Sequence, residues 1–257
     1  MSEHVRAEKR DHVLFVTLAR PERRNAITVA MYSALADTVE DGSSDSSIRL
    51  IAFRGEGQDF AAGNDLADFL QAVPGDREEI AVWRFLRALA DCETPVVAAV
   101  HGNCVGIGTT MLLHCDLVVA EEGTRFSLPF VDLGLVPEAA SSLLLPQMAG
   151  RRLAARYLLL GEAFGVDEAL AIGLISHHSR TGGLDEELGR IIDTLMAKPS
   201  DALRATQHLL RLGQRESIRE RMRLEGSLFA ERLKSSEVKE AISAFFEKRK
   251  PDFSNGR

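Results

Sequence analysis

The sequence lacks long hydrophobic runs and an excess of basic charge. No stretch of 18 consecutive apolar residues occurs in the 257-residue chain, so we expect no membrane-spanning helix. The net charge of −7 argues against the broad basic surface of a nucleic-acid-binding protein, so we expect no nucleic-acid partner. Residues 1–12 are charged and contain no apolar segment, which is unlike a signal peptide, and we therefore expect a cytoplasmic protein.

Disulfide frameworks and metal sites are also not expected. The cysteines are three in number and lack the spacing of metal ligands; they are Cys92, Cys104 and Cys115. Because the last two lie in an apolar stretch, we expect small buried thiols there. The histidines at 101, 114, 177 and 178 are not spaced as metal ligands either.

Signatures of other enzyme classes are missing as well. No serine lies in a nucleophile elbow of the kind that hydrolases use. The glycine-rich segment GNCVGIG at 102–108 lacks the GxGxxG spacing of a dinucleotide-binding turn.

The composition is that of an ordinary globular protein, with 45% hydrophobic and 27% charged residues. A chain of this length forms one large domain, or one domain with a helical appendage. The sequence pattern favours a division into a core at 1–198 and a C-terminal helical region at 199–257.

Strands and helices alternate in the first part of the chain, which predicts an α/β core. Predicted strands lie at 12–18, 48–53, 95–100, 117–120 and 174–178. Predicted helices begin at a Thr28 cap, ending near Glu40 before a turn-rich break at 41–47, and at a capping box formed by Asp76 and Glu79. A short helix capped by Asp167 follows later, and from 184 to 250 we expect only helices. Their apolar stripes are compatible with packing on their own domain or on another subunit.

The stretch from 98 to 150 carries the chemistry. It is predicted to contain a buried strand, a glycine-rich turn that opens a helix, a second strand, and a further helix opened by Pro137 and Glu138. Turn amides at the start of a helix offer fixed N–H donors to a developing negative charge. Glu138 is the lone charge between 133 and 149. Such donors together with one carboxylate fit proton abstraction next to a carbonyl group.

Four blocks in this order resemble the enoyl-CoA hydratase/isomerase (crotonase) superfamily. They are FAAGNDL (60–66), PVVAAVHGNCVGIG (95–108), CDLVVA (115–120) and FSLPFVDLGLVPE (126–138). The resemblance implies a spiral of repeated ββα units, a C-terminal helical trimerisation region and an acyl-CoA thioester as substrate. It also implies a homotrimer or a hexamer made of two trimers. No cofactor is implied, because coenzyme A is part of the substrate.

The same resemblance assigns roles to individual positions. The backbone amides of Asn64 and Ile107 correspond to the family's oxyanion hole, and Phe130 and Thr110 to its acyl pocket. Positions implied to contact coenzyme A are Arg23, Arg24, Ala61, Ala62, Asp65 and Lys250. For the side chain of Asp65, capping of the following helix is the favoured interpretation.

The sequence departs from the family's hydratases at both of their catalytic glutamates. Thr110 and Phe130 occupy these two positions, and neither side chain can activate water, so hydration is disfavoured. Glu138 instead matches the single glutamate of the Δ3,Δ2-enoyl-CoA isomerase branch, where one carboxylate shuttles a proton. Burial would raise the pKa of Glu138 and a place in the first turn of a helix would lower it, which leaves the balance open.

Other functions remain compatible with these residues. One is a different reaction of the superfamily, such as a ring-opening isomerisation or weak enoyl-CoA hydration. Another is a CoA-binding protein without catalysis, because a fold does not imply a function.

Overall fold

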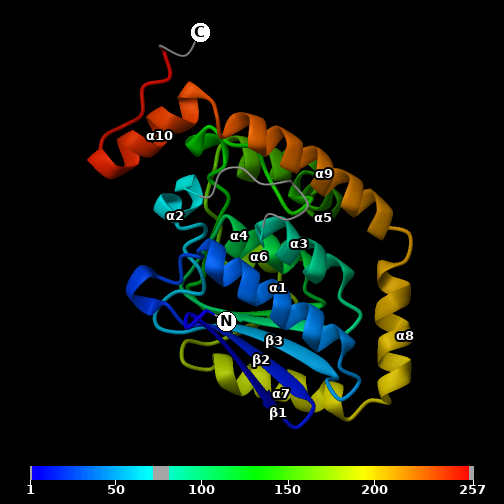
Figure 1. Ribbon diagram of the computed structural model, residues 1–257. Coiled ribbons are helices and arrows are strands. Elements are labelled where there is room, and N and C mark those ends of the chain that lie inside the picture. Colours follow the sequence, from blue (N-terminus) through cyan, green and yellow to red (C-terminus); the bar gives the residue numbers. More distant parts are fainter. Residues whose placement is uncertain (1, 72–80, 255–257) are drawn as a thin grey trace.

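The computed structural model describes residues 2–71 and 81–254, which form a mixed α/β fold (Figure 1). Its main element is a six-stranded sheet in which neighbouring strands are parallel, except for the first pair. In spatial order the strands are β1 (Val5–Arg10), β2 (Val13–Leu18), β3 (Leu50–Gly55), β4 (Val96–Val100), β6 (Leu117–Glu121) and β8 (His177–Ser179).

The predicted strands at 12–18, 48–53, 95–100 and 117–120 are confirmed to within two residues, and that at 174–178 forms later, at 177–179. Strand β1 was not predicted. It is an edge strand that pairs antiparallel with β2 and buries only Val5, so its charged sequence carries no apolar signal.

Two apolar layers enclose the parallel strands. On one face, Val13, Ala52, Val97 and Val119 pack against helix α7 (Leu184–Met196). Alternate residues of the same strands point to the opposite face, where they join the larger core beneath helices α1 (Val29–Ser44) and α3 (Ala81–Asp91) (Figure 1). Burial on both faces explains why these strands appear as continuous apolar runs in the sequence.

A second, smaller set of strand pairings stacks successive turns of the chain beside one another. Strands β5 (Asn103–Val105) and β7 (Arg125–Ser127) pair in parallel, and isolated bridges join Ile27 to Asn64 and Ala61 to Cys104. The pair β4 and β5, and the pair β6 and β7, each contribute one strand to the large sheet and one to the small sheet, and each pair is followed by a helix. This arrangement agrees with the expected spiral of ββα units.

Two predicted helix boundaries were wrong. Thr28 does cap α1, since its hydroxyl accepts a hydrogen bond from the Met31 amide at 3.2 Å. The helix nevertheless continues through the predicted break to Ser44. A Cβ on Gly42 would come within 2.7 Å of Leu14, so tight packing on β2 takes precedence over the local turn signal. The second error concerns α5, which spans Ser141–Leu159 with a non-helical Gly150 and does not begin at Pro137-Glu138.

Later helices follow the prediction closely. Helix α6 (Val166–Ala171) forms, although Gly165 occupies its cap position and Asp167 lies in its first turn. Beyond α7 come three helices: α8 (Ser200–Arg211), α9 (Arg215–Arg232) and α10 (Ser236–Glu247). The capping box at Asp76 and Glu79 lies outside the described residues. Among the described helices, none is long and apolar enough to cross a membrane.

Candidate active site

A cleft of about 720 Å³ opens between the glycine-rich turns and the C-terminal helices α9 and α10. Predicted site residues that line it are Arg23, Ala62, Asn64, Asp65, Ile107 and Phe130. The others lie outside its wall, namely Arg24, Ala61, Thr110, Glu138 and Lys250. The structure therefore brings most of the predicted binding residues to one place, whereas the predicted base, Glu138, does not line this cleft.

The two chain segments that carry the glycine-rich turns approach each other closely. Ala61 and Cys104 form a bridge, and the Val105 amide donates to the Ala61 carbonyl at 2.9 Å. A Cβ on Gly108 would lie 2.9 Å from the Cβ and the carbonyl oxygen of Ala61. Gly63, at φ +89°, would place its Cβ only 3.0 Å from the Val105 carbonyl. Glycine is therefore needed for the close approach of the two turns.

The two amides predicted to bind an oxyanion are free for that purpose. Asn64 pairs with Ile27 through the groups of its neighbours, Gly63 and Asp65, which leaves its own N–H directed away from the bridge. Ile107 is the first residue of helix α4 (Ile107–Thr110), where amides have no intrahelical acceptor. Within the described part of the chain, neither N–H donates to a backbone carbonyl.

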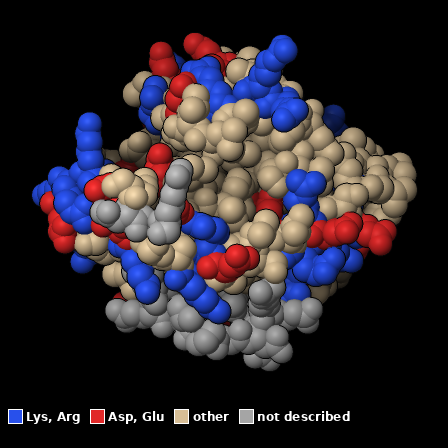
Figure 2. Space-filling model, turned by 90° about the horizontal axis from the view of Figure 1, so that it is seen from above, with Lys and Arg blue, Asp and Glu red and all other residues tan. Residues whose placement is uncertain are grey.

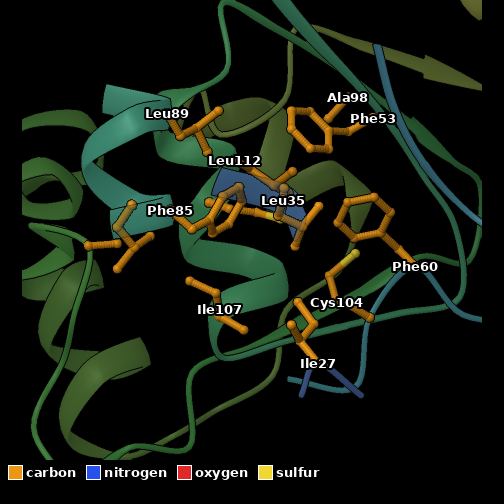
Figure 3. Close-up of a cluster of buried hydrophobic side chains, with 14 of the residues drawn as sticks. Ile27, Leu35, Phe53, Phe60, Phe85, Leu89, Ala98, Cys104, Ile107 and Leu112 are labelled. Carbon is orange, nitrogen blue, oxygen red and sulfur yellow. The ribbon is translucent and has the colours of Figure 1, made fainter. Parts of the chain in front are cut away.

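Burial of the Ile107 side chain fixes the second turn. Figure 3 shows this side chain within the buried cluster that contains Phe85, Cys104 and Leu112. Its exposed fraction is 2%, while the residue still lines the cleft. The side chain thus anchors the turn in the core and leaves the amide available at the cleft.

Glu138 is a buried carboxylate with one satisfied oxygen. Its Oε1 accepts a hydrogen bond from the Thr110 hydroxyl, whereas its Oε2 has no partner among the described residues. Burial raises the pKa of Glu138 to about 8; the Thr110 hydrogen bond opposes this shift and the nearby charge of Glu225 adds to it. The residue precedes α5 by three positions, so the expected place in the first turn of a helix was wrong. Desolvation therefore decides the open question of its pKa.

Tyr32 contacts the first of the two turns. Its hydroxyl donates to the side-chain Oδ1 of Asn64. Burial raises the pKa of Tyr32, and the charge of Glu138 raises it further. Thr110 lies three residues after Ile107, which corresponds to about 5 Å along a helix axis. The Ile107 amide is therefore about one helical turn from Thr110, the hydrogen-bond partner of Glu138.

The turn that carries Glu138 is strained. Ala139 and Ala140 have φ values of +59° and +55°, a region that costs an alanine about 1–2 kcal/mol per residue. His114 stabilises the turn through a 2.8 Å hydrogen bond from its Nε2 to the Ala139 carbonyl. Burial lowers the pKa of His114 to about 4, so the ring is neutral at pH 7 and its Nε2 carries the hydrogen.

Glu225 of α9 stabilises the same turn from the other side. Its exposed fraction is 4%, and it accepts hydrogen bonds from the Ala140 amide at 2.6 Å and the Ser142 amide at 3.0 Å. The Ser142 hydroxyl donates to it at 2.6 Å. Burial raises the pKa of Glu225, while these three donors favour the ionised form.

The cations expected to contact coenzyme A differ in their availability. Arg23 lines the cleft and makes no ion pair with a described residue. Arg24 points toward Asp59, with 3.8 Å between Nε and Oδ2. The exposed Lys250 lies outside the cleft wall, although its neighbours Arg249 and Pro251 line it. Arg23 is therefore the free cation best placed at this cleft among the predicted residues.

Asp65 has a structural role. Its Oδ1 accepts from the amides of Ala67 and Asp68 at 3.2 Å, which confirms the favoured interpretation as a cap for helix α2 (Leu66–Gln71). Its Oδ2 accepts from Arg20 at 2.7 Å. The backbone amide of Ala62 is also occupied, by the Arg24 carbonyl at 2.9 Å. A role of these residues in binding coenzyme A stays a prediction.

The C-terminal helices supply an aromatic wall that sequence analysis missed. Phe229 of α9, Phe245 and Phe246 of α10, and Phe253 line the cleft. Seen from above, the molecule shows a broad uncharged area bounded by charged side chains, with a hollow at its centre (Figure 2). The available signal was the apolar pattern of these helices, which cannot say which surface they cover.

Other contributors missed from the sequence are Arg20, Tyr32, His114 and Glu225. Their contacts join parts of the chain that are distant in sequence, so no local pattern predicts them. Among the described residues, no three His, Cys, Asp or Glu side chains gather in a way that could hold a metal ion.

Comparison with known proteins identifies the family of this chain. The family described as enoyl-CoA hydratase/isomerase matches residues 8–256. The 2,3-dehydroadipyl-CoA hydratase of Escherichia coli (strain K12) is 34% identical over 98% of this chain and 99% of its own length. The enoyl-CoA delta isomerase 2 of Rattus norvegicus is 32% identical over 90% of this chain and 60% of its own length.

A solved structure gives the same result for the fold. The enoyl-CoA hydratase/isomerase from Pseudoalteromonas atlantica T6c superimposes with a TM-score of 0.93 at 40% identity, covering 98% of this chain and all of that one. Hydratases and isomerases match at similar identity, so the comparisons do not separate the two reactions. The chain belongs to the enoyl-CoA hydratase/isomerase family and is an enzyme that acts on acyl-CoA thioesters.

Proposed function

We propose that this enzyme moves a carbon–carbon double bond from the Δ3 to the Δ2 position of an enoyl-CoA, with Glu138 as the single proton shuttle. The observation that carries the proposal is the pair formed by Thr110 and Glu138. Thr110 occupies the position of one hydratase glutamate, and its hydroxyl orients the carboxylate of Glu138. Oε2 is left without a partner among the described residues and is the oxygen available to take a proton.

The first half of the reaction forms a dienolate. Oε2 of Glu138 takes a proton from C2, the C2–H electrons form a C1–C2 double bond, and the thioester carbonyl electrons move to its oxygen. The amides of Asn64 and Ile107 donate to this oxyanion. Loss of one such donor typically costs about 3–4 kcal/mol of transition-state stabilisation.

The second half returns the same proton. The C3–C4 double bond takes it from Glu138 at C4, a new C2–C3 double bond forms, and the oxyanion electrons restore the carbonyl group. The balance requires no oxidant, reductant or external acid, so the proposal needs no cofactor besides the coenzyme A of the substrate. A carboxyl with a pKa of about 8 suits both steps, because a shuttle works best with a pKa near the operating pH.

Hydration is less well supported by the same residues. It requires one group to activate water and another to protonate carbon. Phe130 is apolar and Thr110 is engaged with Glu138, so the two hydratase positions provide neither group. We infer that any hydration by this enzyme is slow relative to isomerisation.

We also infer that the chain assembles as a homotrimer or as two stacked trimers. Exposed leucines on α8 and α9 support a subunit contact; they include Leu209, Leu210, Leu224 and Leu228. Light scattering tests this point, and a stable monomer would contradict it.

The test of the reaction incubates the purified enzyme with a 3-enoyl-CoA and follows the conjugated 2-enoyl thioester by absorbance. We expect rapid conversion by the wild type and loss of conversion in Glu138→Gln, which has the same shape but no basic oxygen. Hydration of a 2-enoyl-CoA is measured alongside. Hydration as fast as isomerisation would contradict the proposal, and binding without conversion would redirect the search to other acyl groups, such as ring-opening substrates.

A further inference from the structure

The turn that carries Glu138 is stabilised by a residue far along the chain. Glu225 is buried on α9, and its two carboxylate oxygens accept three hydrogen bonds from the segment directly after Glu138. Both residues bonded through their amides, Ala140 and Ser142, lie within four positions of Glu138. The contact therefore joins the C-terminal helical region to the proposed base.

The turn needs such a contact because its backbone is unfavourable. Two consecutive alanines, Ala139 and Ala140, have positive φ, a conformation that side chains rarely adopt without external support. Helix α5 begins immediately afterwards, at Ser141, and has no side-chain cap of its own. Glu225 accepts from the Ala140 amide just before that helix and from the Ser142 amide in its first turn, where no side chain of α5 provides a cap.

We infer that Glu225 is a positioning residue, which fixes the strained turn so that Glu138 meets both the Thr110 hydroxyl and the reacting carbons. The inference rests on the proposed role of Glu138 as the base. A small rotation of the turn would displace the carboxylate from its working position, and a misplacement of about 1 Å can lower a rate about 100-fold.

The arrangement also gives the C-terminal helices a part in catalysis beyond assembly. Arg221, one turn before Glu225 on α9, donates to the Ser142 hydroxyl at 3.0 Å and to its carbonyl at 3.3 Å. The start of α5 is thus fixed to α9 by two charged side chains of opposite sign. Any shift of α9 would therefore be transmitted to the turn at Glu138.

The test compares Glu225→Gln with Glu220→Gln, an exposed carboxylate on the same helix. In Glu225→Gln, one carboxylate oxygen becomes an NH₂ group that faces an amide donor. The hydrogen bond from that amide is lost, while the side chain keeps its size. We expect kcat for isomerisation to fall about 10- to 100-fold, with KM changed less than about twofold, because the coenzyme A contacts are untouched. Glu220→Gln should retain both constants.

A crystal structure of the Glu225→Gln enzyme gives a readout that is independent of activity. We expect Ala139 and Ala140 to leave positive φ and the Thr110–Glu138 hydrogen bond to break. An unchanged turn together with unchanged kcat would overturn the inference. If the wild type isomerises no 3-enoyl thioester, the proposed function is wrong, but the crystal structure still decides whether Glu225 fixes the turn. Ser142→Ala, which removes one donor to Glu225, should give smaller changes in the same direction if Glu225→Gln does not fold.

Discussion

The stability of Glu138→Gln relative to the wild type should increase as the pH rises. The wild-type carboxyl keeps its proton in the folded protein up to about pH 8, whereas an unfolded chain releases it near 4.5. Between these values the folded state binds more protons than the unfolded state. Rising pH therefore favours unfolding, which is the reverse of the usual behaviour of a carboxyl group.

The magnitude follows from the two pKa values. The full difference corresponds to about 5 kcal/mol of unfolding free energy once the pH exceeds 8. Between pH 5 and pH 7 the loss is about 2–3 kcal/mol. The variant has no titrating group at this position and does not experience that loss. Its own buried NH₂ group costs about 1–3 kcal/mol, but this cost is the same at every pH.

The assay is urea unfolding of both proteins at pH 5 and pH 7, at one protein concentration because assembly shifts the apparent stability. The quantity of interest is the free-energy difference between variant and wild type at each pH, since the titrating groups that do not interact with Glu138 cancel. Glu220→Gln, an exposed change, serves as the control and should show no pH-dependent difference. A difference for Glu138→Gln that is equal at both pH values would refute the argument that burial governs this carboxyl.

Three further predictions concern the cleft. The isomerisation rate should rise with pH toward a plateau above about 8. Thr110→Val should move this rise to higher pH, because the Thr110 hydroxyl lowers the pKa of Glu138. Identical pH profiles of kcat/KM for the two enzymes would contradict this. Gly108→Ala should lower kcat about tenfold or more, because its methyl group would lie 2.9 Å from Ala61 and push the two turns apart; an unchanged rate would show that the close approach is not needed. Arg23→Ala should raise KM for a CoA thioester but not for the corresponding pantetheine thioester, which lacks the nucleotide phosphates; equal effects on both would place Arg23 elsewhere.

The sequence predicts those parts of the fold that depend on local patterns. The parallel strands are continuous apolar runs because both of their faces are buried, and Thr28 marks a helix start because its hydroxyl caps the helix. The two glycine-rich turns were also recognised, since close approach leaves room only for glycine at Gly63 and Gly108.

Prediction failed where a distant contact takes precedence over a local preference. The segment after Glu138 appeared to begin a helix, but Ala139 and Ala140 adopt positive φ under the influence of His114 and Glu225. An alanine pair does not predict positive φ, because alanine normally favours a helix. The raised pKa of Glu138 could not be predicted for the same reason, because it depends on burial by distant parts of the fold.

The central claim is that one buried carboxylate carries a proton from C2 to C4 of the substrate. The most direct measurement uses a 3-enoyl-CoA with deuterium at C2, converted in ordinary water, with the product analysed by mass spectrometry and NMR for deuterium at C4. Because Glu138 is 3% exposed, we expect part of the deuterium to appear at C4 before it exchanges with solvent. A product whose new C4 hydrogen always comes from water would contradict the single-carboxylate account.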